Sequence, residues 1–153
     1  MEISIHSLLE GATRATGTVA IIDVFRAFTT AAVSLANGAS KIVMVGTVEE
    51  ALALRDAGSG HVCIGEVGGR APDGFDFGNS PFEISTIDFR NKTIIQRTSA
   101  GAQGIVATSR AERLYAALAG HGRGDCPRSS LGFSRSNLPR RDGRQWHQPN
   151  GRG

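Results

Sequence analysis

The chain has 153 residues and a formal net charge of +3 at neutral pH, and this length fits one ordinary domain. Its two cysteines, Cys63 and Cys126, exclude a disulfide framework, and no segment approaches the roughly 20 consecutive apolar residues that cross a bilayer. The N-terminus begins with the acidic Glu2 and has no long apolar stretch, so we expect a cytoplasmic protein with no secretory signal and no membrane partner.

Charge is distributed unevenly along the chain. Residues 120–153 contain seven arginines against two aspartates, a net charge of +5, which leaves −2 for residues 1–119. The sequence pI of about 9.4 therefore reflects the C-terminal residues alone. Nucleic-acid binding would need a basic stripe on an ordered element or stacking aromatics, and Phe133 and Trp146 are isolated. We expect no nucleic-acid partner.

Strand-like and helix-like segments alternate over residues 1–109. Residues 1–5 are one strand candidate, and four apolar, β-branched runs predict further strands at Thr18–Phe25, Lys41–Val45, His61–Val67 and Lys92–Thr98. The first of these four runs is apolar at successive positions, which is typical of a strand covered on both faces.

Three helices are predicted between these strands. Ala27–Ala36 has apolar residues at helical spacing and ends at Asn37-Gly38, where glycine can adopt the left-handed cap. Thr47 begins the next helix, with Glu50 three residues on as in a capping box, and Ser99 opens the third. The alternation predicts an α/β sheet with helices on both faces.

Composition changes abruptly near residue 119. Arg110–Ala119 should begin another strand or helix, but Gly, Arg, Pro and Ser dominate from there on. We therefore divide the chain into an α/β part, residues 1–118, and a segment, residues 119–153, too poor in apolar residues to pack. This segment is interpreted as a flexible basic tail, a low-complexity linker, or the out-of-frame translation of a GC-rich gene; the change in mid-element favours the last.

The first candidate site lies where a buried strand is followed by a helix. Asp23 is a carboxylate able to hold a hard cation, and Arg26 offers a bidentate fork for phosphate or sulfonate beside a helix N-terminus. An Asp23–Arg26 ion pair that merely caps the helix explains the pattern equally well.

Further candidates follow the next strands. Glu66 precedes two glycines that let a ligand approach the backbone, although a surface Glu before a turn is the simpler interpretation. The long Gly68–Pro81 loop is of a length that is usually functional or disordered. It contains the oxygen donors Asp76 and Asn79, with Asp73 a weaker candidate.

A hydroxyl-rich turn follows the last predicted strand. Thr98, Ser99 and Gly101 form a strand-to-helix turn whose hydroxyl and N–H groups can cradle a phosphate. The alternative is that Ser99 is simply a helix N-cap. The turn has the spacing of neither a Walker loop nor a dinucleotide fingerprint.

Five motifs occur together in one order: DVFRAFTT, ANGA with VGTVEEA, GEVGG, GFDFGNSP and RTSAGAQG. This combination resembles the 2-phosphosulfolactate phosphatase family over residues 1–118. The resemblance implies a three-layer α/β/α fold with a mixed, largely parallel sheet, truncated here. It also implies Mg²⁺-dependent hydrolysis of a phosphate ester on a sulfonated 2-hydroxy acid, a step toward coenzyme M.

The resemblance carries functional positions over residue by residue. We expect Asp23, Glu66 and Asp76 to hold Mg²⁺ and position water as the catalytic acids. The small anionic substrate would be bound by Arg26, Asn79, Thr98, Ser99 and Gly101. A homodimer is one expectation for the full-length protein.

The chain also departs from the family pattern. Val67 stands where the family commonly has an arginine, between Glu66 and the two glycines. Family members continue well past 153 residues, so we expect this truncated chain to be inactive. The alternative to a phosphatase is a non-catalytic anion-binding protein, and Mg²⁺-dependent phosphate release would discriminate the two.

Overall fold

The computed structural model describes residues 2–118, 131–133 and 144–146. Its helices are α1 (Leu8–Arg14), α2 (Ala27–Ala36), α3 (Val48–Asp56) and α4 (Gly101–Ala107). Its strands are β1 (Gly17–Asp23), β2 (Lys41–Met44), β3 (Val62–Gly65), β4 (Thr93–Arg97), β5 (Ala111–Leu118), β6 (Leu131–Phe133) and β7 (Arg144–Trp146). No helix within these residues is long and apolar enough to span a membrane.

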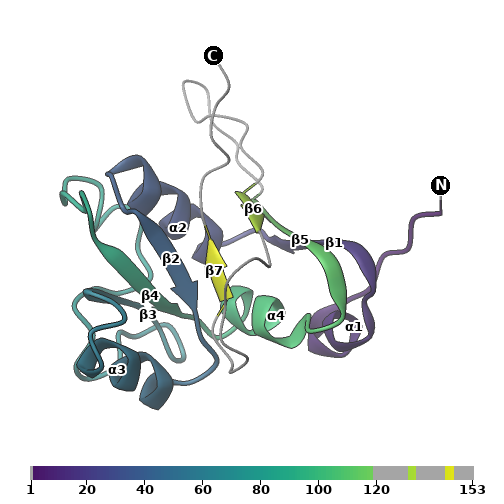
Figure 1. Cartoon of the computed structure of the whole chain (residues 1–153), viewed down its shortest axis with the longest axis horizontal. Coiled ribbons are helices and arrows are strands. Elements are labelled where there is room, and N and C mark those ends of the chain that lie inside the picture. Colours follow the sequence, from purple (N-terminus) through teal and green to yellow (C-terminus); the bar gives the residue numbers. More distant parts are fainter. Residues whose placement is uncertain (1, 119–130, 134–143, 147–153) are drawn as a thin grey trace.

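The strands form two open sheets (Figure 1). One has the order β3-β4-β2-β7, with β2, β3 and β4 parallel and β7 antiparallel to β2. The other has the order β1-β5-β6, with β1 and β5 parallel and β6 antiparallel. The expected mixed α/β architecture is confirmed, but its strands are divided between two sheets.

Two apolar clusters cover the two faces of the larger sheet. On one face, Val43, Cys63 and Ile95 pack with Ala51 and Leu54 of α3. On the other, alternate strand residues pack against α2 and α4, and the cluster continues to β5; its members include Phe28, Ile42, Met44, Ile64, Ile94, Ala102, Ile105 and Leu114. Helices α2 and α4 therefore lie between the two sheets, and α3 covers the far face of the larger one.

Local signals for α2 and α3 are confirmed. Helix α2 ends at Asn37, and Gly38 follows with φ +95°, the left-handed conformation that glycine adopts without strain. Helix α3 begins after Thr47, whose hydroxyl accepts a hydrogen bond of 3.1 Å from the Glu50 N–H. The Glu50 carboxylate accepts from the N–H of Gly46 at 3.0 Å, one residue before the cap itself.

Two expectations for the N-terminal region are wrong. Residues 2–5 form no strand, and the first element is α1, which packs on α4. The run Thr18–Phe25 is not covered on both faces, because β1 alternates between half-buried and exposed residues. Its pairing with β5 instead of the larger sheet leaves its outer face exposed.

The structure describes only β6 and β7 from residues 119–153, and the remainder of that segment lies outside the described residues. Strand β6 pairs with β5, and β7 pairs with β2. The division of the chain at residue 118 and the three interpretations of residues 119–153 stay predictions.

Gly65 provides a test of the packing between β3 and β4. A Cβ atom at this position would lie 1.8 Å from the carbonyl oxygen of Arg97, a backbone atom that cannot move aside cheaply. We expect Gly65→Ala to lower the free energy of unfolding by about 3 kcal/mol, measured by urea titration followed by circular dichroism.

Gly46→Ala is the matched control, because a Cβ atom there meets only side-chain atoms at 3.9 Å. Its free energy of unfolding should change by less than about 1 kcal/mol. Equal stability of the two variants would show that the β3–β4 contact is not as tight as described.

Candidate active site at the carboxyl ends of the strands

Asp23 lies at the carboxyl end of β1, half-buried against the start of α2. Its Oδ2 accepts a hydrogen bond of 3.0 Å from the N–H of Ala27. Burial raises the pKa of Asp23; hydrogen bonds from backbone groups oppose this, and the nearby negative charge of Glu66 adds to it. Gly101 packs tightly here, since a Cβ atom on it would lie 2.9 Å from Oδ2 of Asp23.

Glu66 follows β3 and joins two turns through its buried carboxylate. Oε1 accepts from the Ser99 N–H at 2.6 Å, and Oε2 accepts from the Ser99 hydroxyl at 3.0 Å and from the Gly69 N–H at 2.9 Å. Burial alone would raise the pKa of Glu66, but these hydrogen bonds and the charge of Arg97 outweigh it and hold the pKa below its usual value. The carboxylate is therefore ionised and already bonded to the protein.

Arg97 is a site residue that the sequence interpretation missed. Its Nη1 donates to the Glu66 carbonyl at 2.7 Å, and its Nε donates to the Gly46 carbonyl at 3.4 Å. Gln103 donates to the same Gly46 carbonyl at 2.6 Å. These contacts join the carboxyl ends of β2, β3 and β4. The sequence contains a signal for this role, because Arg97 directly precedes Thr98 within the RTSAGAQG motif.

The turn after β4 uses much of its own hydrogen-bonding capacity. The Thr98 hydroxyl accepts from the Ala102 N–H at 2.9 Å, and Ser99 donates both its N–H and its hydroxyl to Glu66. Thr98 is buried, whereas Ser99 is exposed. The turn is thus built around Glu66 and Thr98, and fewer of its donors face an incoming anion than the sequence interpretation assumed.

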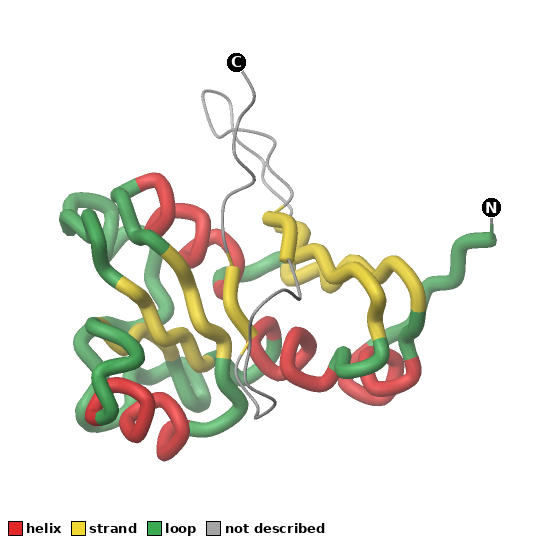
Figure 2. The backbone as a smooth tube through the Cα atoms, in the orientation of Figure 1, coloured by secondary structure: helices red, strands yellow, loops and turns green. Residues whose placement is uncertain are grey.

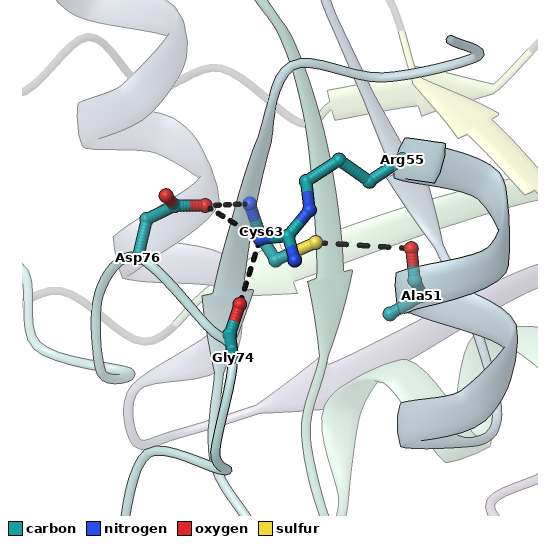
Figure 3. A network of polar contacts seen from close by, with 5 residues as sticks. All are labelled: Ala51, Arg55, Cys63, Gly74 and Asp76. Carbon is teal, nitrogen blue, oxygen red and sulfur yellow. Dashed lines mark hydrogen bonds and ion pairs between the residues drawn. The ribbon is translucent and has the colours of Figure 1, made fainter. Parts of the chain in front are cut away.

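Asp76 lies away from the carboxyl end of β3. Its Oδ2 accepts from the Cys63 N–H at 2.8 Å, and Arg55 donates to both Asp76 and the Gly74 carbonyl, at 3.4 and 2.7 Å (Figure 3). These contacts hold the Gly68–Pro81 loop against α3 and against β3, an edge strand of the larger sheet. Cys63 is a core residue: it is fully buried, and burial raises the pKa of its thiol.

Asn79 lies in the same loop, two residues after Phe77, which forms one parallel bridge with Ile64 of β3. The Asn79 Oδ1 atom is buried and receives no hydrogen bond within the described part of the chain, so a protein acceptor remains available there.

Arg26 occupies the N-cap position of α2 and is exposed. The alternative Asp23–Arg26 ion pair does not form: within the described residues the ion pairs are Arg14–Glu10, Arg55–Asp76 and Arg90–Asp88. Because Asp23 accepts from Ala27 instead, the guanidinium of Arg26 is left for solvent or for a ligand.

Within residues 2–118, 131–133 and 144–146, no group of three or more His, Cys, Asp or Glu side chains could hold a metal ion. Mg²⁺ commonly uses only one or two protein carboxylates and keeps several waters. Asp23 and Glu66 are carboxylates and Asn79 has an unbonded amide oxygen, and these are the donor types that Mg²⁺ binds.

The fold defines an α/β protein whose strands carry acidic and basic side chains at their carboxyl ends. Comparison with known proteins is more specific, since the family model described as 2-phosphosulpholactate phosphatase matches residues 3–119. The chain belongs to this family.

Three similar proteins carry the name "Probable 2-phosphosulfolactate phosphatase". The one from Thermotoga petrophila is 41% identical over 65% of this chain and 43% of its own length. That from Bacillus subtilis is 37% identical over 62% and 42%, and that from Carboxydothermus hydrogenoformans is 41% identical over 64% and 40%. The chain thus spans about two fifths of the length of these relatives.

The lowered pKa of Glu66 predicts an acid-sensitive contribution to stability. A carboxylate whose pKa is lower in the folded state stabilises the fold above its unfolded pKa of about 4.3. That contribution is lost as the pH falls through the folded value. We expect Glu66→Gln to lower the free energy of unfolding at pH 7 by about 1–3 kcal/mol and to lose less stability below pH 4.3 than the wild type, in urea titrations across pH.

Glu112→Gln serves as the control, because Glu112 is exposed on β5. Its acid profile should follow the wild type. If Glu66→Gln were as stable as the wild type at pH 7 and as acid-sensitive, the network around Ser99 would not be formed.

Proposed function

We propose that this chain is the part of a Mg²⁺-dependent phosphatase that carries the acidic strand ends. The substrate would be a 2-phospho-3-sulfolactate-like 2-hydroxy acid, hydrolysed at its phosphate ester in the cytoplasm on the way to coenzyme M. The observation that carries the proposal is that Asp23 and Glu66, which follow or end β1 and β3 at their carboxyl ends, interact electrostatically and have pKa values shifted in opposite directions. Such pairs are typical of catalytic sites.

The two carboxylates have different proposed roles. Asp23 has one oxygen bonded to Ala27 and is half-buried, so it is the better candidate to ligate the metal or accept a proton from water. Glu66 is bonded to Ser99 and Gly69, so it positions the turn and adds negative charge beside Asp23. Mg²⁺, when bound, would neutralise phosphoryl charge and orient the attacking water.

The substrate's anionic groups have candidate partners on both sides of Asp23. Arg26 presents a free guanidinium at the start of α2, where the helix dipole also favours an anion. Ser99 and Gly101 follow β4; a Cβ atom on Gly101 would lie 2.9 Å from Oδ2 of Asp23, and Ser99 already donates its N–H and its hydroxyl to Glu66. Asn79 supplies an acceptor for a substrate hydroxyl or a metal-bound water. Asp76 is retained as a catalytic candidate only through family resemblance, since its contacts fasten the loop.

A non-catalytic anion-binding protein is the second candidate. It is favoured by Val67, which has no charge for an anion. In that case the chain would bind phosphate through Arg26 without Mg²⁺-dependent release.

Asp23→Asn tests the phosphatase proposal. The test uses a fusion of residues 1–118 to the part of the Thermotoga petrophila relative that lies outside its match to this chain. Phosphate release from 2-phosphosulfolactate is measured with and without EDTA. We expect EDTA to abolish turnover and Asp23→Asn to lower it by about two orders of magnitude or more. The melting temperature at pH 7 should stay equal or rise, because the raised pKa means that the charged form costs stability there.

The unextended chain of 153 residues is assayed in parallel and should release no phosphate. Turnover that survives EDTA in the extended protein, or that is unaffected by Asp23→Asn, would contradict the proposal. Tight phosphate binding without release would favour the non-catalytic candidate.

Arg26→Lys tests the proposed anion contact in the same extended protein. Lysine keeps the positive charge but removes the bidentate fork, so we expect KM to rise about tenfold, the effect of one lost hydrogen bond to a charged group. Arg110→Lys is the control, since Arg110 is exposed and precedes β5. An unchanged KM for Arg26→Lys would remove Arg26 from the site.

A further inference from the structure

The outer face of the β1–β5 sheet is apolar and exposed. In β1 the alternate residues Thr18, Ala20 and Ile22 are exposed, and Ile22 is 69% accessible. In register, Ala20 lies opposite Tyr115 and Ile22 lies opposite Ala117 of β5. The face therefore presents a short apolar row, Ala20 and Ile22 beside the half-buried Tyr115 and Ala117, and a polar pair, Thr18 and Arg113, at its start.

The other face of the same strands is already packed. Ile21 lies against α4, where a Cβ atom on Gly104 would come within 3.1 Å of its Cγ2, and Leu114 of β5 is buried in the main core. Figure 2 shows α1 and α4 on this one side of the two strands. The exposed residues thus belong to the opposite face of β1 and β5, and repacking the buried face would not cover them.

Exposed apolar residues also occur before and after β1 in the chain. Val24 and Phe25 follow the strand, with Phe25 83% accessible. Before it, Ile3, Ile5 and Leu8 are also exposed. Strand β1 is an edge strand of its sheet among the described strands, so its outward hydrogen-bonding groups face no described partner.

Parallel strands are normally covered on both faces, because each face is apolar. More than half of each relative's length lies outside its match to this chain, enough to supply both a strand beside β1 and a layer over its outer face. A second copy of the chain would present the same short apolar row and the same acidic strand ends, so it is the less suitable occupant.

We propose that the outer face and free edge of β1, with Val24 and Phe25, are the docking surface for the part of a family member that lies outside the match. Docking would complete the sheet and cover Ile22. It would also enclose the edge at which Asp23 lies, since Asp23 directly precedes Val24. This inference goes beyond the phosphatase activity and does not depend on it.

The test is binding, measured separately from catalysis. The full 153-residue chain is co-expressed with the part of the Thermotoga petrophila relative outside the match, and the complex is isolated and sized by chromatography with light scattering. We expect a one-to-one complex and slower amide hydrogen exchange at Gly17–Asp23 than in the chain alone. Ile22→Asp should weaken association by about tenfold or more, because it places a charge in an apolar interface.

Phe82→Asp is the matched control, because Phe82 is equally apolar and 89% accessible but lies outside this face. It should leave the complex intact. Both side chains are exposed in the chain alone, so neither substitution is expected to unfold it, and circular dichroism checks this.

Three outcomes would overturn the docking proposal: no complex, a complex unaffected by Ile22→Asp, or an Ile22-dependent homodimer that excludes the added polypeptide. A complex that forms but releases no phosphate with Mg²⁺ would uphold the docking surface and contradict the proposed function. The two failures are therefore distinguishable.

Discussion

The site depends on one buried carboxylate that holds two turns together. Glu66 and Ser99 are 33 residues apart in sequence, yet the Glu66 carboxylate accepts both donors of Ser99 and the N–H of Gly69. Charge-assisted hydrogen bonds of this kind are stronger than neutral ones, and leaving their donors unpaired in a buried place is costly. The ends of β3 and β4 are therefore held in one arrangement, and Arg97 extends it to β2 through Gly46.

Local sequence signals were enough to predict most elements and the gathering of polar residues. Thr47 and Gly38 are recognisable because a cap and a left-handed turn each need a particular residue type. Strands β2, β3 and β4 are recognisable as short apolar runs, and parallel strands bring their carboxyl ends to one edge. Glu66 and Ser99, which follow β3 and β4, could therefore be predicted to lie together, whereas Asp23 ends a strand of the other sheet.

Other features depended on contacts that no local pattern specifies. The apolar run Thr18–Phe25 would have the same sequence pattern in either sheet. The sequence therefore does not indicate that β1 pairs with β5. Asp76 and Asn79 are three residues apart in one loop, yet Asp76 is bonded to the Cys63 N–H while Oδ1 of Asn79 receives no hydrogen bond within the described residues. The exposure of Ile22 was also unexpected, because composition indicates only that a residue can be buried.

The two acids at the site are shifted in opposite directions for connected reasons. The Glu66 charge is stabilised by Ser99, Gly69 and Arg97, and that same charge contributes to raising the pKa of Asp23. Asp23 is thus kept ready to gain a proton or a cation, and a bound cation would relieve both its burial and its repulsion by Glu66. Excluding water strengthens every such interaction. Asp23 is followed directly by the exposed Val24 and Phe25. A polypeptide that covers those two residues would exclude water and so strengthen the electrostatic interaction between Asp23 and Glu66.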